Sequence, residues 1–251
     1  AYCREAREIG VRIFEGVQVN GALTSANIVN GVDTELGQIQ CEVVVNCAGM
    51  WARELGMANQ VDIPLYAVQH FYALTESIPG VYPDMPTFRD PDGLIYGREE
   101  VGGMLVGCFD RNAIPVSLSE LPQPFEFGLL EENWDQFLPY MEEAIKRLPA
   151  LADTGIRSLV NGPESFTPDA EAHLGPAPGL RNYYVLAGLS SSGITRSGGM
   201  SAALARWIVD GDPGLDVSNF SLERFSPEQN TEKFLRQCIR DIPSGHFSLE
   251  N

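Results

Sequence analysis

Two apolar strands that each run through glycine into a helix constrain the fold of this chain most. Residues 43–45 lead into a first junction at residues 46–51, which contains Gly49, and residues 183–187 lead into a second junction at residues 186–199, which contains Gly188 and Gly193. An uninterrupted apolar strand that opens through glycine into a helix is typical of a buried parallel strand. Ligands bind at the carboxyl ends of such strands, where glycine and the helix N-terminus allow close approach. We therefore expect a parallel sheet and a ligand site where the two junctions meet.

The section between the junctions has a different period. Side chains alternate in character along residues 65–74, and two further strands are predicted at residues 94–98 and 104–109. An apolar stripe predicts a helix over residues 127–148, with a kink at Pro139. The fold class that follows is α/β with α+β character: part of a parallel-sheet lobe, with an antiparallel-sheet lobe inserted into it.

Glycines divide the remaining segments. A helix is predicted over residues 1–9 and a strand over 11–14, and residues 21–37 are interpreted as a meander with a turn at Asn30-Gly31. A strand at 156–160 is expected to end in a turn at Asn161-Gly162-Pro163. The small-residue helix after the second junction is expected from Ser197 onward, and a weak helix is predicted at 228–240 in the tail.

Charge and cysteine content exclude several classes of protein. The chain carries 17 basic and 34 acidic residues, a net charge of −17, which argues against binding to nucleic acid or to an anionic membrane. Five unpaired-looking cysteines indicate a reducing compartment, either the cytoplasm or, in a eukaryote, the mitochondrial matrix. No histidine–carboxylate spacing indicates a metal site, and no apolar run reaches the roughly 18 residues of a membrane span. Because the chain begins at Ala1 inside a predicted helix, we interpret it as a fragment.

Five sequence blocks follow one another along nearly the whole chain: VVNCAGMWARELG (44–56), IPLYAVQHFYALT (63–75), LIYGREE (94–100), VNGPESFTPD (160–169) and NYYVLAGLSSSGITRSGGMSAALARWIVDGDP (182–213). Together they resemble FAD-dependent amine oxidoreductases of the dimethylglycine and sarcosine dehydrogenase group, within the D-amino-acid-oxidase-like flavoproteins. The group's N-terminal G-x-G-x-x-G dinucleotide-binding motif does not occur in this sequence, nor does the aminomethyltransferase-like domain that follows the oxidase part in many relatives. The resemblance therefore implies a fragment that holds FAD weakly or not at all by itself, with tetrahydrofolate a possible ligand of a missing domain.

The resemblance implies roles for individual residues. Val19 would contact the adenine, and the flavin end of FAD would be surrounded by Ala48, Gly49, Trp51, Gly188, Leu189, Ser192, Gly193, Ile194 and Thr195. His70 and Tyr96 match positions where relatives place a histidine and a tyrosine that face the amine substrate. An imidazole has an ordinary pKa of about 6.5, which suits a group that keeps the amine neutral, because hydride leaves readily from carbon beside a neutral amine.

Other candidate residues carry weaker signals. Arg98 can bind a substrate carboxylate through two parallel hydrogen bonds, and Arg196 is the alternative. His173 is expected in a loop near the flavin, with a solvated loop histidine as the alternative, and His246 is expected to have no role.

The predicted division of the chain has four parts. Residues 1–60 and 155–215 would form the two parts of the FAD-binding lobe, residues 61–154 the substrate-binding lobe, and residues 216–251 the C-terminal tail. The predicted reaction is oxidation of an N-methylated amino acid similar to sarcosine or dimethylglycine, by hydride transfer to FAD, with an unknown electron acceptor. The alternative is a non-catalytic regulatory subunit, because the blocks also resemble the regulatory subunit of pyruvate dehydrogenase phosphatase.

Overall fold

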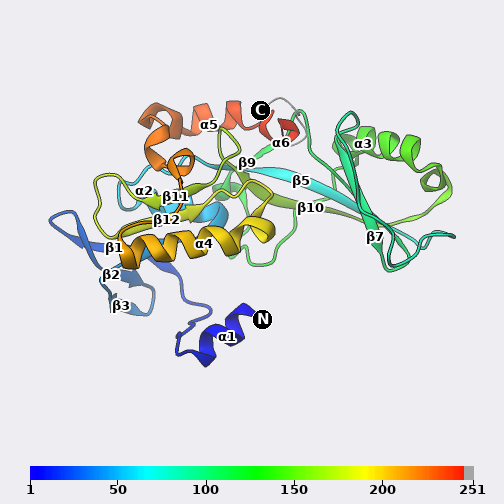
Figure 1. Cartoon of the computed structure of the whole chain (residues 1–251). Coiled ribbons are helices and arrows are strands. Elements are labelled where there is room, and N and C mark those ends of the chain that lie inside the picture. Colours follow the sequence, from blue (N-terminus) through cyan, green and yellow to red (C-terminus); the bar gives the residue numbers. More distant parts are fainter. Residues whose placement is uncertain (246–251) are drawn as a thin grey trace.

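Two sheets and a small meander form the body of the protein, of which a computed structural model describes residues 1–245. The helices are α1 (Tyr2–Glu8), α2 (Ala52–Met57), α3 (Trp134–Arg147), α4 (Gly193–Asp210), α5 (Glu232–Cys238) and α6 (Ile242–Gly245). Figure 1 shows β5 and β10 as long neighbouring strands that run from the region of β12 toward β7 and α3. The mixed α/β fold class predicted from the sequence is confirmed. His246 lies outside the described residues.

The smaller sheet contains the predicted parallel pair. Its strand order is β11 (His173–Pro176), β12 (Tyr183–Ala187) and β4 (Val44–Asn46). Strand β12 is parallel to β4, with Tyr183 opposite Val44 and Val185 opposite Asn46, whereas β11 is antiparallel to β12. Contrary to expectation, β4 is not fully buried, since Val45 is 40% exposed. The reason is that β4 stands at the edge of this sheet.

A three-stranded meander precedes β4. It consists of β1 (Val19–Ser25), β2 (Ile28–Thr34) and β3 (Gly37–Gln40). The turn predicted at Asn30-Gly31 is wrong, because Gly31 lies inside β2, where an added Cβ would lie 2.6 Å from the carbonyl oxygen of Ile39. The first turn is instead made by Ala26 and Asn27, both with positive φ.

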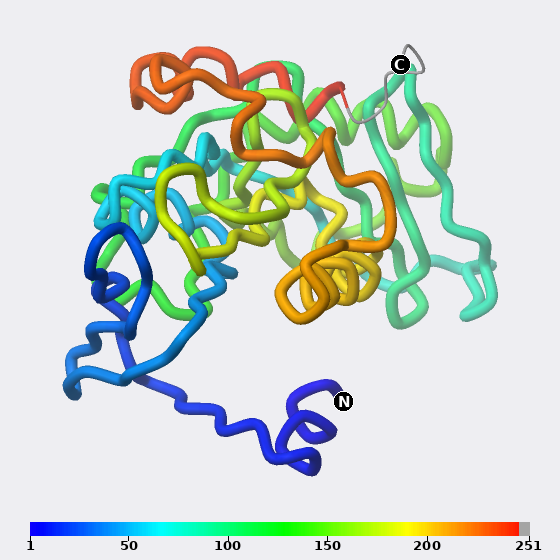
Figure 2. The backbone as a smooth tube through the Cα atoms, turned by 60° about the vertical axis from the view of Figure 1, so that its left-hand side comes forward, coloured from blue at the N-terminus to red at the C-terminus, as the bar shows by residue number. Residues whose placement is uncertain are grey.

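The N-terminal end stands apart from the body. Helix α1 has no buried residue and projects from the rest on an extended segment (Figure 2). The strand predicted over residues 11–14 does not form, since these residues pair with no other strand in the described part of the chain.

The larger sheet is antiparallel and follows the predicted alternation. Its order is β10 (Ile156–Phe166), β5 (Tyr66–Thr75), β8 (Gly103–Cys108), β7 (Ile95–Glu100) and β6 (Phe88–Asp90), and β9 (Pro115–Val116) also pairs with β5. Phe71 and Ala73 are fully buried and pack with Phe137 and Met141 of α3. Because side chains alternate along a strand, His70 and Tyr72 point to the opposite face.

Two predicted element boundaries in this region were wrong. Strand β10 does not turn at Asn161-Gly162-Pro163 but pairs with β5 through Phe166. Pro163 is tolerated because β10 is the edge strand, where a missing N–H breaks no ladder. Helix α3 begins at Trp134 rather than residue 127, capped by the Asn133 side chain, which accepts a hydrogen bond from the Gln136 N–H.

The helix after the second junction begins earlier than predicted. Helix α4 starts at Gly193 instead of Ser197, and it ends as expected at Gly211, which adopts a left-handed conformation. The weak tail helix predicted at 228–240 forms as the shorter α5. Among residues 1–245, every helix is too short or too polar to cross a bilayer. The four-part division of the chain stays a prediction; strand β10, assigned there to the FAD-binding lobe, pairs with β5 along its length.

Candidate active site

The two glycine junctions lie at one edge of the smaller sheet. Strands β4 and β12 are adjacent and parallel, so their carboxyl ends, Asn46 and Ala187, open in the same direction. The first junction continues as a short 3₁₀ helix, Gly49–Trp51, and the second continues into α4. An added Cβ at Gly49 or at Gly193 would meet nothing within 4 Å, so both glycines border open space. This edge is where the sequence predicted a ligand.

One buried amide shapes the first junction. The Asn46 side chain is 1% exposed, and its Nδ2 donates to the Ala52 carbonyl at 2.9 Å and to the Tyr183 hydroxyl at 3.0 Å. Its Oδ1 accepts the Ala48 N–H at 3.1 Å. Asn46 therefore closes the turn locally and ties it to β12.

The second junction turns sharply through residues with positive φ. These are Gly188 at 65°, Ser190 at 44° and Ser191 at 65°. Ser190 is buried, and its Oγ donates to the Gly188 carbonyl at 3.2 Å and accepts the Thr167 N–H at 3.4 Å. Because non-glycine residues adopt such angles only at a cost, contacts from outside the turn must hold it.

A row of aromatic side chains forms the open face of the larger sheet. Tyr72, Gly107 and Tyr96 lie side by side across β5, β8 and β7, and an added Cβ at Gly107 would overlap the Tyr96 ring. The Phe109 ring lies 5.2 Å from the His70 ring and 5.5 Å from the Tyr96 ring, between centroids. The structure therefore places His70 and Tyr96 on one face, around the Phe109 ring.

Burial keeps the Tyr96 hydroxyl protonated. Desolvation, and then the neighbouring Cys108 and Glu164, raise the pKa of Tyr96 well above its usual range. Tyr96 can therefore serve as a hydrogen-bond donor and not as a base.

Glu164 connects this face to the second junction. It lies on β10, and its Oε2 is 3.6 Å from His70 Nε2 and accepts a hydrogen bond from Ser191 Oγ at 3.1 Å. Its side chain is 30% exposed, and that of His70 is 14% exposed. Sequence reasoning missed Glu164, because the turn predicted at residues 161–163 hid the alternation that brings it onto the His70 face.

A cavity of about 500 Å³ adjoins Glu164. It is lined by Met50, Trp51, Phe125, Phe127, Gly128, Leu129, Gly162, Pro163, Glu164 and Ser165. The first junction, the edge of β10 and the loop before α3 thus surround one apolar space with a single carboxylate. A second cavity of about 500 Å³, at β6 and the end of α3, is remote from the junctions.

The remaining predicted site residues occupy more exposed positions. Trp51 is 43% exposed, Val19 at the start of β1 is 41% exposed, and Ile194 in the first turn of α4 is 99% exposed. Arg98 lies on the Tyr96 face, but its Nη2 is 2.6 Å from Glu100 Oε2. Arg196 pairs with Glu171 at 2.9 Å. Among residues 1–245, no cluster of three or more histidine, cysteine or acidic side chains is placed to hold a metal ion.

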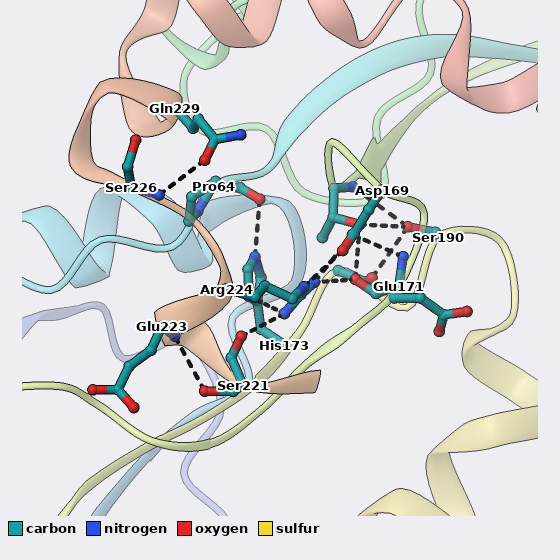
Figure 3. Close-up of polar contacts among 12 residues, drawn as sticks. Pro64, Asp169, Glu171, His173, Ser190, Ser221, Glu223, Arg224, Ser226 and Gln229 are labelled. Carbon is teal, nitrogen blue, oxygen red and sulfur yellow. Dashed lines mark hydrogen bonds and ion pairs between the residues drawn. The ribbon is translucent and has the colours of Figure 1, made fainter. Parts of the chain in front are cut away.

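His173 is neither a flavin-loop residue nor a solvated one. It lies on β11, is fully buried, and its Nε2 is 2.9 Å from the Pro64 carbonyl oxygen. Burial, and then the charge of Arg224, lower its pKa to about 4, so the ring is neutral near pH 7. Figure 3 shows His173 beside Arg224, which also contacts Asp169.

Comparison with known proteins identifies the family. The FAD dependent oxidoreductase (DAO) family matches residues 1–207. The mitochondrial pyruvate dehydrogenase phosphatase regulatory subunit of Mus musculus is 40% identical over 255 residues, covering 100% of this chain and 29% of that protein. The mitochondrial sarcosine dehydrogenase of Mus musculus is 40% identical over 225 residues, covering 90% of this chain and 24% of that protein. This chain therefore belongs to the FAD dependent oxidoreductase family, as the sequence predicted.

A solved structure supports the fold. The L-proline dehydrogenase of P. horikoshii superimposes with a TM-score of 0.74 at 24% identity, covering 89% of this chain and 57% of that one. The chain spans less than a third of the length of the two curated relatives.

Proposed function

We propose that the protein containing this chain oxidises an N-methylated amino acid, similar to sarcosine or dimethylglycine, with FAD as the oxidant. The single observation that carries this proposal is the position of Glu164. Its carboxylate faces His70 on the substrate side and accepts a hydrogen bond from Ser191 of the second junction. One carboxylate thereby joins the predicted substrate face to the predicted flavin edge. Sarcosine dehydrogenase, at 40% identity, supports the choice of substrate.

The residues present fit the flavin end of FAD. Gly49 and Gly193 border open space, and α4 begins without a side-chain cap, so the N–H groups of its first turn face outward for an acceptor. We assign the flavin ring to Ala48, Gly49 and Trp51 on one side and to Gly188, Leu189, Ser192, Gly193, Ile194 and Thr195 on the other. Val19 is assigned to the adenine, and the pyrophosphate to a segment outside this sequence.

The substrate face binds and prepares the amine. We assign His70 Nε2 to hold or accept the proton of the amine, so that the nitrogen lone pair can assist the departing hydride. Glu164 would attract the cationic amine to the site and stabilise the imidazolium that forms. The Tyr96 hydroxyl, held protonated, would donate to the substrate carboxylate, and Arg98 would join it by leaving Glu100.

The proposed reaction is a two-electron oxidation of the N-methyl group. Bound flavin would supply the acceptor for the hydride of the N-methyl carbon. Loss of that hydride from the neutral amine leaves an iminium ion. Water captures it to give formaldehyde, the demethylated amine and one proton, unless tetrahydrofolate bound elsewhere in the protein takes the one-carbon unit.

His70→Ala in the flavin-loaded full-length protein tests the assignment. We expect anaerobic bleaching of the flavin by sarcosine or dimethylglycine to slow by roughly 100-fold, the usual contribution of a general base. Glu143→Gln is the control: Glu143 lies on α3, which packs on the opposite face of the same sheet, and pairs with Lys146, so this variant should retain the wild-type rate. Unchanged bleaching in His70→Ala would remove His70 from the mechanism.

A non-catalytic regulatory subunit is the second candidate function. It is supported by the 40% identity that extends over the whole chain to the phosphatase regulatory subunit. The same experiment separates the two, because a regulatory protein would show no bleaching by any N-methylated amine, even without substitution. For either function we propose a cytoplasmic or mitochondrial-matrix location, supported by five free cysteines.

A further inference from the structure

The C-terminal tail docks against the site although it lies beyond the family match. The match ends at residue 207, whereas Arg224, Asn230 and α5 follow it. The Asn230 side chain is buried. Its Oδ1 accepts a hydrogen bond from Arg53 Nε, and its Nδ2 donates to Asp62 Oδ1 at 2.6 Å. The tail is therefore fixed to the body at several points, and Arg224 is one of them.

Arg224 uses every one of its N–H groups. Nε donates to Asp169 Oδ2 at 2.7 Å, and Nη2 donates to Asp169 Oδ1 at 3.1 Å and to the Glu171 carbonyl at 2.7 Å. Nη1 donates to the Ser221 carbonyl at 2.9 Å and to His173 Nδ1 at 3.1 Å. Five donors meet five acceptors, and the side chain is only 15% exposed. A lysine, with three donors and no planar fork, cannot replace this arrangement.

From Asp169 the contacts continue to the second junction. Thr167 Oγ1 donates to the Glu171 carbonyl at 2.8 Å, with Asp169 Oδ1 at 3.1 Å and Ser190 Oγ at 3.4 Å, and the Thr167 N–H donates to Ser190 Oγ. Figure 3 shows Asp169 between Arg224 and Ser190, with dashed lines from Arg224 to Asp169. An added Cβ at Gly188 would lie 2.6 Å from Thr167 Cγ2, so Thr167 also packs directly under the turn.

Arg224 reaches the same turn by a second route. His173 stands opposite Ala187, the last residue of β12 before Gly188. Because Nδ1 of His173 accepts from Arg224, its Nε2 carries the proton and donates to the Pro64 carbonyl. The guanidinium thus fixes the neighbours of the turn on both sides, at Thr167 and at His173.

We propose that Arg224 is a positioning residue for the flavin: through Asp169 and Thr167 it holds residues 188–192 in the strained conformation that faces the cofactor. The inference rests on the proposed function, since it takes the second junction as the flavin-binding turn. It adds to the site a residue of the tail, beyond the residues that the family model matches.

Titration of flavin-free full-length protein with FAD, followed by quenching of flavin fluorescence, tests the inference. We expect Arg224→Met and Arg224→Lys each to raise the dissociation constant by about tenfold or more, the effect of losing one charge-assisted contact. The visible circular dichroism of the bound flavin, at saturating FAD, should change as well, because the turn relaxes. Arg236→Met is the matched control: Arg236 is another tail arginine, which contacts Tyr66 and Glu232 but not the 167–171 segment, and its constant should stay within twofold of wild type.

Thr167→Val provides an independent variant: it removes the hydroxyl that contacts Asp169, Glu171 and Ser190, and it leaves Arg224 paired with Asp169. It should weaken FAD binding about tenfold as well, and it decides the question alone if Arg224→Met does not fold. A dissociation constant within twofold of wild type in either variant, or an equal loss in Arg236→Met, overturns the inference. Wild-type protein that binds no FAD contradicts the proposed function instead, so the two failures are distinguishable.

Discussion

The two glycine junctions reach the same sheet edge by different means. The first is closed by Asn46, whose amide contacts Ala48 and Ala52, two and six residues away, and one distant partner, Tyr183. The second depends on Thr167 and Glu164, which lie 23 and 27 residues from the serines they contact, and beyond Thr167 on Arg224 of the tail. The first turn is closed mainly by residues near it in the sequence, whereas the second combines a local contact, Ser190 with the Gly188 carbonyl, with contacts from three distant segments.

Substituting one glycine in each junction should produce the largest difference in stability between the two turns. Gly188→Ala should lower the free energy of unfolding by about 4 kcal/mol, because alanine at a φ of 65° is strained and its Cβ would overlap Thr167. Gly49→Ala has a similar φ of 59° but open space around the Cβ, so only the backbone cost of about 1–2 kcal/mol is expected. Urea unfolding of both variants measures the difference, and equal losses would mean that the second turn is not tightly enclosed.

A smaller effect should appear as pH dependence. The folded pKa of His173 is lowered to about 4, mainly by burial, from an ordinary value of 6.5. The unfolded chain therefore binds the proton first, so this contribution to stability is complete above pH 6.5 and is lost as the pH falls toward 4. The total loss is about 3 kcal/mol.

Urea midpoints measured between pH 4.5 and 7, for wild type and His173→Gln, isolate this contribution from that of other groups. The wild-type midpoint should fall more steeply with acidification than that of the variant. Parallel curves would show that His173 titrates normally and that the region around Arg224 is open to water.

Local patterns predicted most of the elements and the parallel pairing of β4 with β12, but not the full extent of β2 and β10. The alternation along β5 and the apolar β12 run were sufficient, because each pattern is set by the strand's own residues. Asn30-Gly31 and Asn161-Gly162-Pro163 have the composition of turns, yet both lie within strands. In each case pairing with a neighbouring strand overrode the local turn preference. That pairing depends on residues outside the segment, so the segment's own sequence does not predict it.

The same limit governed the site. The sequence placed His70 and Tyr96 on suitable strands, and their common face follows from alternation plus the β5–β8–β7 register. Glu164 joins them only through the β10–β5 register, which brings Gly162 opposite His70. Arg224 and His173 meet across 51 residues, and no local pattern signals that contact.

We propose that both junctions bind one cofactor, and backbone hydrogen–deuterium exchange tests this proposal most directly. Full-length protein would be compared with and without FAD, following peptides that contain residues 47–51 and 189–195. We expect FAD to slow exchange in both segments together and to leave the exchange of β3 in the meander unchanged. Protection of only one segment, or of neither, would contradict it.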